Sequence, residues 1–316
     1  MSAASAPGKI VLWGEYAVLA GAPAAVLALD ARATVRLEPT ADSHWHFTSQ
    51  GFVSDPEKVN PAALPSGGAG IFVRQILQHW GLQALEQCGP PRRVITDSAE
   101  FFQQQQKLGL GSSAAVCTAT YQALCDITGR TPNLSEAMHI HKQWQGGKGS
   151  GLDVASVWHG GLIHFRQGKA QVSALPDHWH WQVVWTGASA STPAHITKFN
   201  DWRQSADTRP LDDLAALSET LCEGPATLSD LALYRDALEA LDQAAILNIF
   251  TPEHARLGTL AAACGVLYKP CGAGGGDIGM AFADDPSALA HFRQQAAANG
   301  FTPLDLETAT HGVASH

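Results

Sequence analysis

The chain has 316 residues, of which 45% are hydrophobic and 16% are charged, a composition typical of a globular protein with room for two domains. The net charge of −9 argues against a broad nucleic-acid-binding surface, so an anionic ligand needs a local cluster of lysine or arginine. No apolar run approaches the roughly 18 residues of a membrane helix, and residues 1–6 do not resemble a signal peptide. We therefore expect a cytoplasmic protein that binds neither nucleic acid nor membrane.

The first half of the sequence predicts a β-rich layer followed by helices. Three apolar runs predict strands, over residues 9–12, 24–37 (with a turn inside it) and 92–96. Residues 50–70, rich in glycine, proline, serine and alanine, predict a loop. Helical spacing predicts helices over 71–80 and 134–144. Residues 154–165 predict a helix, a turn at Gly160-Gly161 and a strand.

The second half predicts a separate α+β unit. A strand over 181–186 opens it, which places a domain boundary near residue 175 and divides the chain into residues 1–175 and 176–316. An alanine-rich pattern predicts helices over 211–249. Residues 267–282 predict a strand, a glycine loop and a second strand. Residues 287–299 predict a helix, and residues 304–308 predict a last strand.

The cysteines and histidines indicate neither disulfides nor a metal centre. None of the six cysteines forms a Cys-x-x-Cys pair, and several lie in apolar contexts, as buried free thiols do. His139 and His141 are two residues apart, a spacing that suits no zinc motif on a helix.

A glycine-rich loop over residues 109–115 opens directly into a predicted helix. Glycine lets the backbone approach a ligand closely, and the first N–H groups of a helix suit a phosphate. The loop supplies six candidate nucleotide-binding residues, Gly109, Leu110, Gly111, Ser112, Ser113 and Ala114. Lys107 can also reach the phosphates, and Ser112 and Ser113 can cap the helix or hold Mg²⁺. The alternative is an ordinary glycine turn before a buried helix.

Two more segments accompany this loop: a first motif over residues 7–19 (PGKIVLWGEYAVL) and a third motif over residues 269–277 (KPCGAGGGD). In this order the three resemble the motifs of the GHMP kinases, the family of galactokinase, homoserine kinase, mevalonate kinase and phosphomevalonate kinase. The resemblance implies an α+β GHMP kinase fold. Its N-terminal domain would be like the second domain of ribosomal protein S5, and its C-terminal domain would be ferredoxin-like. ATP and Mg²⁺ are the implied cofactors.

The resemblance also implies roles for single residues. Lys9 of the first motif would lie near the transferred phosphoryl group. The stretch 146–156 resembles a Ser-Gly-x-Asp element, which places Asp153 beside the acceptor oxygen and in a pair with Lys9. The alternative for Asp153 is a helix cap. Gln143 aligns with a glutamate that often holds Mg²⁺ in the family, so the metal would rest on Ser112, Ser113, the phosphates and water.

The acceptor is inferred from three details that resemble phosphomevalonate kinases: Asp277, where mevalonate kinases usually have a further glycine, Lys148, and the serine-bearing segment 185–193. The candidate substrate-binding residues are Lys148, Ser150, Ser189, Ser191, Gly274 and Gly275. The implied reaction is the ATP-dependent phosphorylation of 5-phosphomevalonate to 5-diphosphomevalonate.

Alternative functions remain open. Within the family they are mevalonate kinase or another small-molecule kinase, whereas diphosphomevalonate decarboxylase fits the third motif poorly. From another class, the alternative is a catalytically silent binding protein of the same fold. The presence of Lys9, Ser112, Ser113 and Asp153 argues against silence. The chain would act as a monomer or a homodimer.

Overall fold

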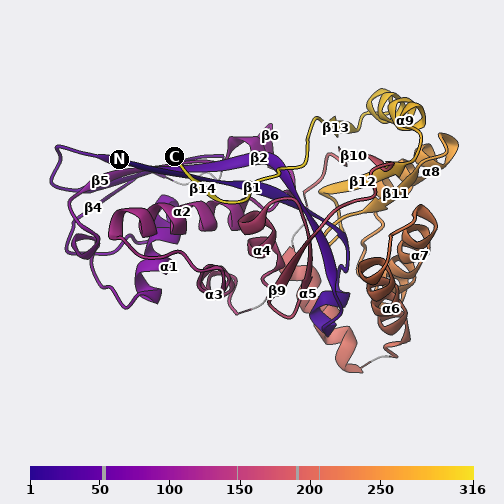
Figure 1. Cartoon of the computed structure of the whole chain (residues 1–316), viewed down its shortest axis with the longest axis horizontal. Helices are drawn as coiled ribbons and strands as arrows, with labels where there is room; N and C mark the ends of the chain where they lie inside the picture. The colour runs from indigo at the N-terminus through magenta and orange to yellow at the C-terminus, as the bar shows by residue number, and fades with distance from the viewer. Residues whose placement is uncertain (52–54, 148, 190–191, 206) are drawn as a thin grey trace.

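The strands of the computed structural model form two main sheets, at opposite ends of the long axis (Figure 1). The structure describes residues 1–51, 55–147, 149–189, 192–205 and 207–316. The two sheets and their helices account for both predicted α+β units, so the predicted fold class is confirmed.

The first sheet has eight strands in the order β14-β1-β2-β5-β3-β4, with β8 paired to β2 and β9 to β8. Their bounds are β1 (Ser2–Trp13), β2 (Ala24–Pro39), β3 (Trp45–Gln50), β4 (Glu57–Val59), β5 (Arg92–Asp97), β8 (Leu162–Arg166), β9 (Lys169–Ser173) and β14 (Ala314–Ser315). β2 is continuous, so the turn expected within residues 24–37 is wrong. The pairing register shifts instead: Pro7 faces Arg32 but Gly8 faces Leu29, a β-bulge that bends the strand pair without ending it.

Helices lie along one face of this sheet (Figure 1). They are α1 (Ile71–His79), α2 (Ser112–Thr128), α3 (Leu134–Trp144) and α4 (Leu152–His159). The central helix is α2, whose alanines 114, 115, 119 and 123 are fully buried against β1 and β2. Small side chains let the helix approach the strands closely. This contact fixes the glycine-rich loop, which ends where α2 begins, against strand β1.

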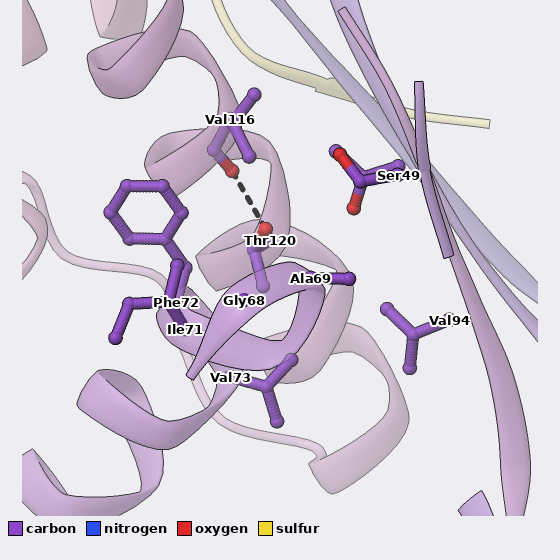
Figure 2. A pocket seen from close by; sticks show the side chains of 10 residues that line it. Ser49, Gly68, Ala69, Ile71, Phe72, Val73, Val94, Val116 and Thr120 are labelled. Carbon is purple, nitrogen blue, oxygen red and sulfur yellow. Dashed lines mark hydrogen bonds between the residues drawn. The ribbon is translucent and has the colours of Figure 1, made fainter. Parts of the chain in front are cut away.

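The helical face is tightly packed, as a small cavity between α1, α2 and the sheet illustrates (Figure 2). The lining is mostly apolar, and its volume of about 10 Å³ is near the lower limit for a single water molecule. Thr120 satisfies its hydroxyl internally by donating to the carbonyl of Val116 at 2.7 Å.

The second sheet is antiparallel, in the order β11-β12-β10-β13. Its strands are β10 (His180–Trp185), β11 (Leu267–Pro270), β12 (Ile278–Ala283) and β13 (Thr302–Leu304). Read from β13, the chain order across the sheet is 4-1-3-2, the ferredoxin-like arrangement that the resemblance implied. Helices α8 (Pro252–Ala263) and α9 (Pro286–Ala298) pack on this sheet and share a buried cluster with it.

Among the described residues between β10 and α8, the chain forms the helices α5 (Thr192–Ser205), α6 (Arg209–Glu223) and α7 (Leu228–Ala245). The short elements are the 3₁₀ helices η1 (Ala17–Ala20), η2 (Gly68–Gly70), η3 (Leu85–Cys88) and η4 (Ala99–Phe101), and the hairpin β6 (Phe102–Gln103) with β7 (Gln106–Lys107). In the described part of the chain, no helix combines the length and apolarity that a membrane crossing requires.

The C-terminal segment returns to the first sheet, so the two termini lie side by side (Figure 1). β14 pairs with β1, and Arg32 donates from its guanidinium to the carbonyl of Gly312 at 2.7 Å. Apart from β14, the strands of the first sheet all precede β10 in the chain, and the second sheet consists of β10, β11, β12 and β13. The domain boundary near residue 175 stays a prediction.

Candidate active site

A cavity of about 580 Å³ opens where the three motifs and the segment 149–153 meet. One part of its wall is charged, with Lys9, Lys107, Asp153 and Asp277 among the lining residues. Another part is apolar and includes Val11, Tyr16, Val18, Leu19, Leu152 and Ile196. A site of this kind suits a small molecule that carries an anionic group on an apolar body.

The glycine-rich loop is built for the close approach of other side chains. Gly111 caps the N-terminus of α2 in the left-handed conformation, with φ of +81°. A Cβ atom there would lie 2.7 Å from Cε of Lys9, and a Cβ atom at Gly109 would lie 2.6 Å from the side chain of Asp277. The backbone N–H of Lys9 donates to the carbonyl of Leu110 at 2.8 Å. The loop therefore places the first motif's lysine directly against the start of α2.

Replacing Gly111 with alanine should lower kcat by about tenfold or more, because displacement of a reacting group by about 1 Å can cost up to 10²-fold. The new Cβ would push the Lys9 side chain away from its position. Gly129, at the other end of α2, is a matched control: its φ is +68°, but open space surrounds its Cβ position. Steady-state kinetics should show Gly129→Ala near wild type. Equal losses for both variants would contradict this role for Gly111.

Lys9 and Asp153 form an ion pair, with Nζ and Oδ1 3.0 Å apart. Lys9 comes from β1, and Asp153 lies in the first turn of α4. Gly151, and not Asp153, is the N-cap residue of that helix, so the capping alternative for Asp153 is wrong. The Asp153 side chain is 33% exposed, which leaves the pair accessible from the cavity.

The electrostatic environment keeps Asp153 ionised. Burial raises the pKa of its carboxyl, but the Lys9 ammonium, through its charge and its hydrogen bond, outweighs burial. A weaker contribution from the charge of Lys107 acts in the same direction as Lys9, and the net pKa lies below the ordinary value. Asp153 is therefore a carboxylate at neutral pH and can orient an acceptor or a cation.

Helix α3 presents a different face to the site than the sequence alignment suggests. Gln143 is exposed and lines a separate surface groove with Gln75 and His79, so it is not placed to hold a metal in the cavity. Trp144 and Gln145 line the cavity instead. His141, on the same face, is 2% exposed and lies 3.2 Å from the Ser113 hydroxyl.

The imidazole of His141 is surrounded by charge. Burial lowers its pKa most strongly, Asp153 opposes that effect, and Lys107 and Lys9 lower the pKa further. The net pKa lies below the ordinary value, so the ring is neutral at neutral pH. Sequence reasoning missed this residue because it tested His141 only as a metal ligand beside His139.

The third motif joins the site through four of its residues, Cys271, Gly272, Ala273 and Asp277. Asp277 has φ of +55°, and its backbone forms hydrogen bonds with two residues, Thr186 and Ala188, of the segment after β10. Its N–H donates to Ala188 O at 2.6 Å, and its carbonyl accepts from Thr186 N at 2.9 Å. The segment 186–189 is thereby fixed beside the glycine-rich loop, where Ser189 donates to the carbonyl of Lys107 at 2.9 Å.

A buried ion pair connects the first and third motifs. Lys269 Nζ lies 2.6 Å from Glu15 Oε1, and both side chains are at most 1% exposed. The hydroxyl of Tyr234, on α7, donates to Glu15 Oε2 at 2.7 Å and accepts from Gly14 N at 2.7 Å. We call Glu15, Lys269 and Tyr234 the buried clasp. It holds the end of β1 against the second sheet.

The other predicted site residues differ in where the structure places them. Ser113 and Ser150 line the cavity, whereas Ser112 is 2% exposed. Gly274 and Gly275 approach Ile249 and His195, and Ser189 is exposed. Lys148 and Ser191 lie outside the described residues. The binding roles of all of these residues stay predictions. The six cysteines are free thiols, and the described residues contain no cluster of three or more metal-ligating side chains.

The fold and the site are similar to those of a known family. Residues 96–161, which include the glycine-rich loop and Asp153, match the model of the GHMP kinases N terminal domain.

Relatives cover nearly the whole chain. The phosphomevalonate kinase of Streptomyces sp. (strain CL190) is 29% identical over 365 residues, spanning 98% of this chain and 97% of its own. The mevalonate kinase of Homo sapiens is 27% identical over 380 residues, spanning 99% and 94%. The structure of Streptococcus pneumoniae phosphomevalonate kinase in complex with phosphomevalonate and AMPPNP has the same fold. Its TM-score is 0.79 at 17% identity, over 98% of this chain and 100% of that chain.

Proposed function

We propose that this protein is a GHMP kinase that transfers the γ-phosphoryl group of ATP to the phosphate of 5-phosphomevalonate, forming 5-diphosphomevalonate and ADP. The observation that carries the proposal is the Lys9–Asp153 pair at 3.0 Å, beside the start of α2 in a cavity large enough for a small acceptor. The full-length similarity to a phosphomevalonate kinase supports the choice of acceptor.

The nucleotide phosphates bind at the glycine-rich loop and the N-terminus of α2. The first turn of a helix offers unpaired N–H groups and a positive dipole end, which together bind phosphate. α2 has Gly111 at its N-cap with no side chain that caps it. Lys107 and Lys9, which both line the cavity beside this terminus, supply positive charge. Phosphoryl transfer depends mainly on such positioning and electrostatic stabilisation.

The acceptor binds between the Lys9–Asp153 pair and the apolar part of the wall. A phosphate monoester with a second pKa near 6 is mostly dianionic at neutral pH and needs no strong general base. Asp153 then acts by orienting Lys9 and the acceptor, and no proton has to move onto its carboxylate. Lys148 is the further cation that the sequence predicts for the acceptor phosphate, and it lies outside the described residues.

The oxygen donors of the cavity fit Mg²⁺. This cation prefers oxygen ligands in octahedral geometry and retains several waters when it binds with nucleotide phosphates. Ser113 would hold it alongside the phosphates, and Asp153 and Asp277 provide carboxylates in the same wall. Ser112, the other predicted metal ligand, is 2% exposed and is not among the residues that line the cavity. When bound, Mg²⁺ would neutralise charge on the phosphates during transfer.

An acceptor panel tests the proposal. Purified protein with ATP and Mg²⁺ is assayed for ADP release with phosphomevalonate, mevalonate, homoserine and galactose. We expect phosphomevalonate to give a kcat/KM at least about tenfold above any other acceptor, because each lost charge-assisted contact costs roughly 1.5–3 kcal/mol. Faster turnover of mevalonate would favour the mevalonate kinase alternative, which the full-length similarity to the human enzyme makes the second candidate. ATP binding without turnover of any acceptor would favour a binding protein.

A further inference from the structure

The hydroxyl of Ser113 has a buried partner, His141, that is not among the residues lining the cavity. Ser113 lies in the first turn of α2 and lines the cavity, and Nε2 of His141 lies 3.2 Å from its Oγ. His141 is 2% exposed. The contact joins α2 to α3 across 28 residues of sequence and brings a ring nitrogen within hydrogen-bond distance of the hydroxyl.

The imidazole is held in place by its neighbours. The ring of Trp144 stacks on it at a centroid distance of 5.5 Å and an interplanar angle of 27°. Trp144 in turn contacts Phe72 of α1 at 5.2 Å. Because helix α3 and the stacked Trp144 ring hold the imidazole in place, Nε2 stays directed at Ser113 Oγ.

A serine hydroxyl has one proton to donate and two lone pairs that accept. A neutral imidazole has one acceptor nitrogen, and the tautomer with its proton on Nδ1 leaves Nε2 free to accept. If the hydroxyl proton points at Nε2, it is directed away from the cavity and the oxygen lone pairs are directed toward it. Lone pairs suit a cation, whereas a phosphate oxygen requires a donor. The orientation therefore favours Ser113 as a metal ligand over Ser113 as a phosphate donor.

We propose that His141 is a positioning residue that accepts the Ser113 hydroxyl proton and so directs the Ser113 oxygen toward the Mg²⁺ of the metal–nucleotide complex. This inference rests on the proposed function. It assigns His141 no contact with substrate, and it requires that all of its effect on metal binding pass through Ser113.

A double-mutant cycle tests that requirement with a readout other than turnover. Mn²⁺ replaces Mg²⁺, and its affinity for the full-length protein saturated with AMPPNP is measured from the electron paramagnetic resonance signal of free Mn²⁺. His141→Leu, which fills the site without an acceptor, should weaken Mn²⁺ binding about five- to tenfold. His141→Gln, which can offer an acceptor oxygen near the same point, should lose less than about threefold. In a Ser113→Ala background, His141→Leu should add less than about twofold.

His139→Leu is the matched control, because His139 is exposed on the same helix and should leave Mn²⁺ affinity unchanged. Circular dichroism and the thermal midpoint establish whether each variant is folded. If His141→Leu is not folded, His141→Gln keeps the test decisive. The inference would be overturned if the substitution at position 141 weakened Mn²⁺ binding equally with and without Ser113. It would also be overturned if the substitution caused no loss of Mn²⁺ affinity with Ser113 present. If the wild-type protein binds no Mn²⁺–AMPPNP at all, the proposed function fails, and the inference fails with it.

Discussion

Replacement of Lys9 with alanine should lower kcat by about 10²-fold or more, because it removes charge stabilisation worth several kcal/mol from the transferred phosphoryl group. Lys9 is 12% exposed, is paired with Asp153 at 3.0 Å, and lies against Gly111 at the start of α2. The loss should appear mainly in kcat, since the charge develops in the transition state. Steady-state kinetics with saturating ATP and acceptor measures it.

Lys58→Ala is the control for this variant. Lys58 also pairs with an aspartate, Asp42 at 2.8 Å, but its side chain is 53% exposed and it is not among the cavity residues. It should retain wild-type kcat, because exposed ion pairs contribute little. A folded Lys9→Ala protein with kcat within about threefold of wild type would contradict the catalytic role of Lys9.

Asp153→Asn should separate orientation from proton transfer. With a phosphate acceptor the loss should be milder than for Lys9→Ala, since the acceptor already carries its negative charge. With an alcohol acceptor the two losses should be comparable, because a base would then have to take the hydroxyl proton.

Replacement of Lys269 with methionine should destabilise the protein by about 3–5 kcal/mol, because it leaves the charge of Glu15 buried without its cation. The side chains of Lys269 and Glu15 are 0% and 1% exposed. Burial lowers the pKa of Lys269, but Cys271 and Glu15 together raise it above its ordinary value, so the ammonium form prevails in the clasp. The free energy of unfolding in urea measures the effect.

The double variant Lys269→Met with Glu15→Gln isolates the electrostatic cause. Removing both charges should recover much of the lost stability, since a buried ion pair adds little over neutral groups of similar size. Unchanged stability in the single variant, or no recovery in the double variant, would show that the clasp does not act as an ion pair.

The sequence was sufficient for elements whose apolar spacing is regular. The helices over 71–80 and 134–144 and the strands around 92–96 and 181–186 were predicted to within about two residues of the structure. The β-bulge in β2 was misread as a turn, because periodicity shows an interruption but not whether pairing continues across it. Helix α5 was not predicted because it is largely polar.

Helix α8 was missed although a signal was present. Thr251 precedes Pro252 and accepts a hydrogen bond from the N–H of His254, so the sequence Thr-Pro-Glu-His carries both an N-cap and a proline in the first turn. The capping pattern was overlooked because the alanine-rich region before it was treated as one helical stretch.

The candidate site was predictable where residues follow a glycine loop that precedes a helix, as Ser113 and Asp153 do. Lys9 lies in strand β1 and was identified from the first motif. Helical spacing could also have excluded Gln143, since residues 141, 144 and 145 share a face of α3 and residue 143 does not. The buried clasp could not be predicted from the sequence, because Glu15 and Lys269 are 254 residues apart and no local pattern indicates that they form a contact.

The most direct test of the central claim is ³¹P nuclear magnetic resonance of the product formed from ATP, Mg²⁺ and 5-phosphomevalonate. The account predicts that the phosphomonoester signal is replaced by the two coupled signals of a diphosphate ester, with one ADP formed for each phosphomevalonate consumed. Mevalonate under the same conditions should give little monophosphate. Persistence of the phosphomonoester signal, with mevalonate converted efficiently to its monophosphate, would contradict the account and assign the cavity to the alcohol acceptor.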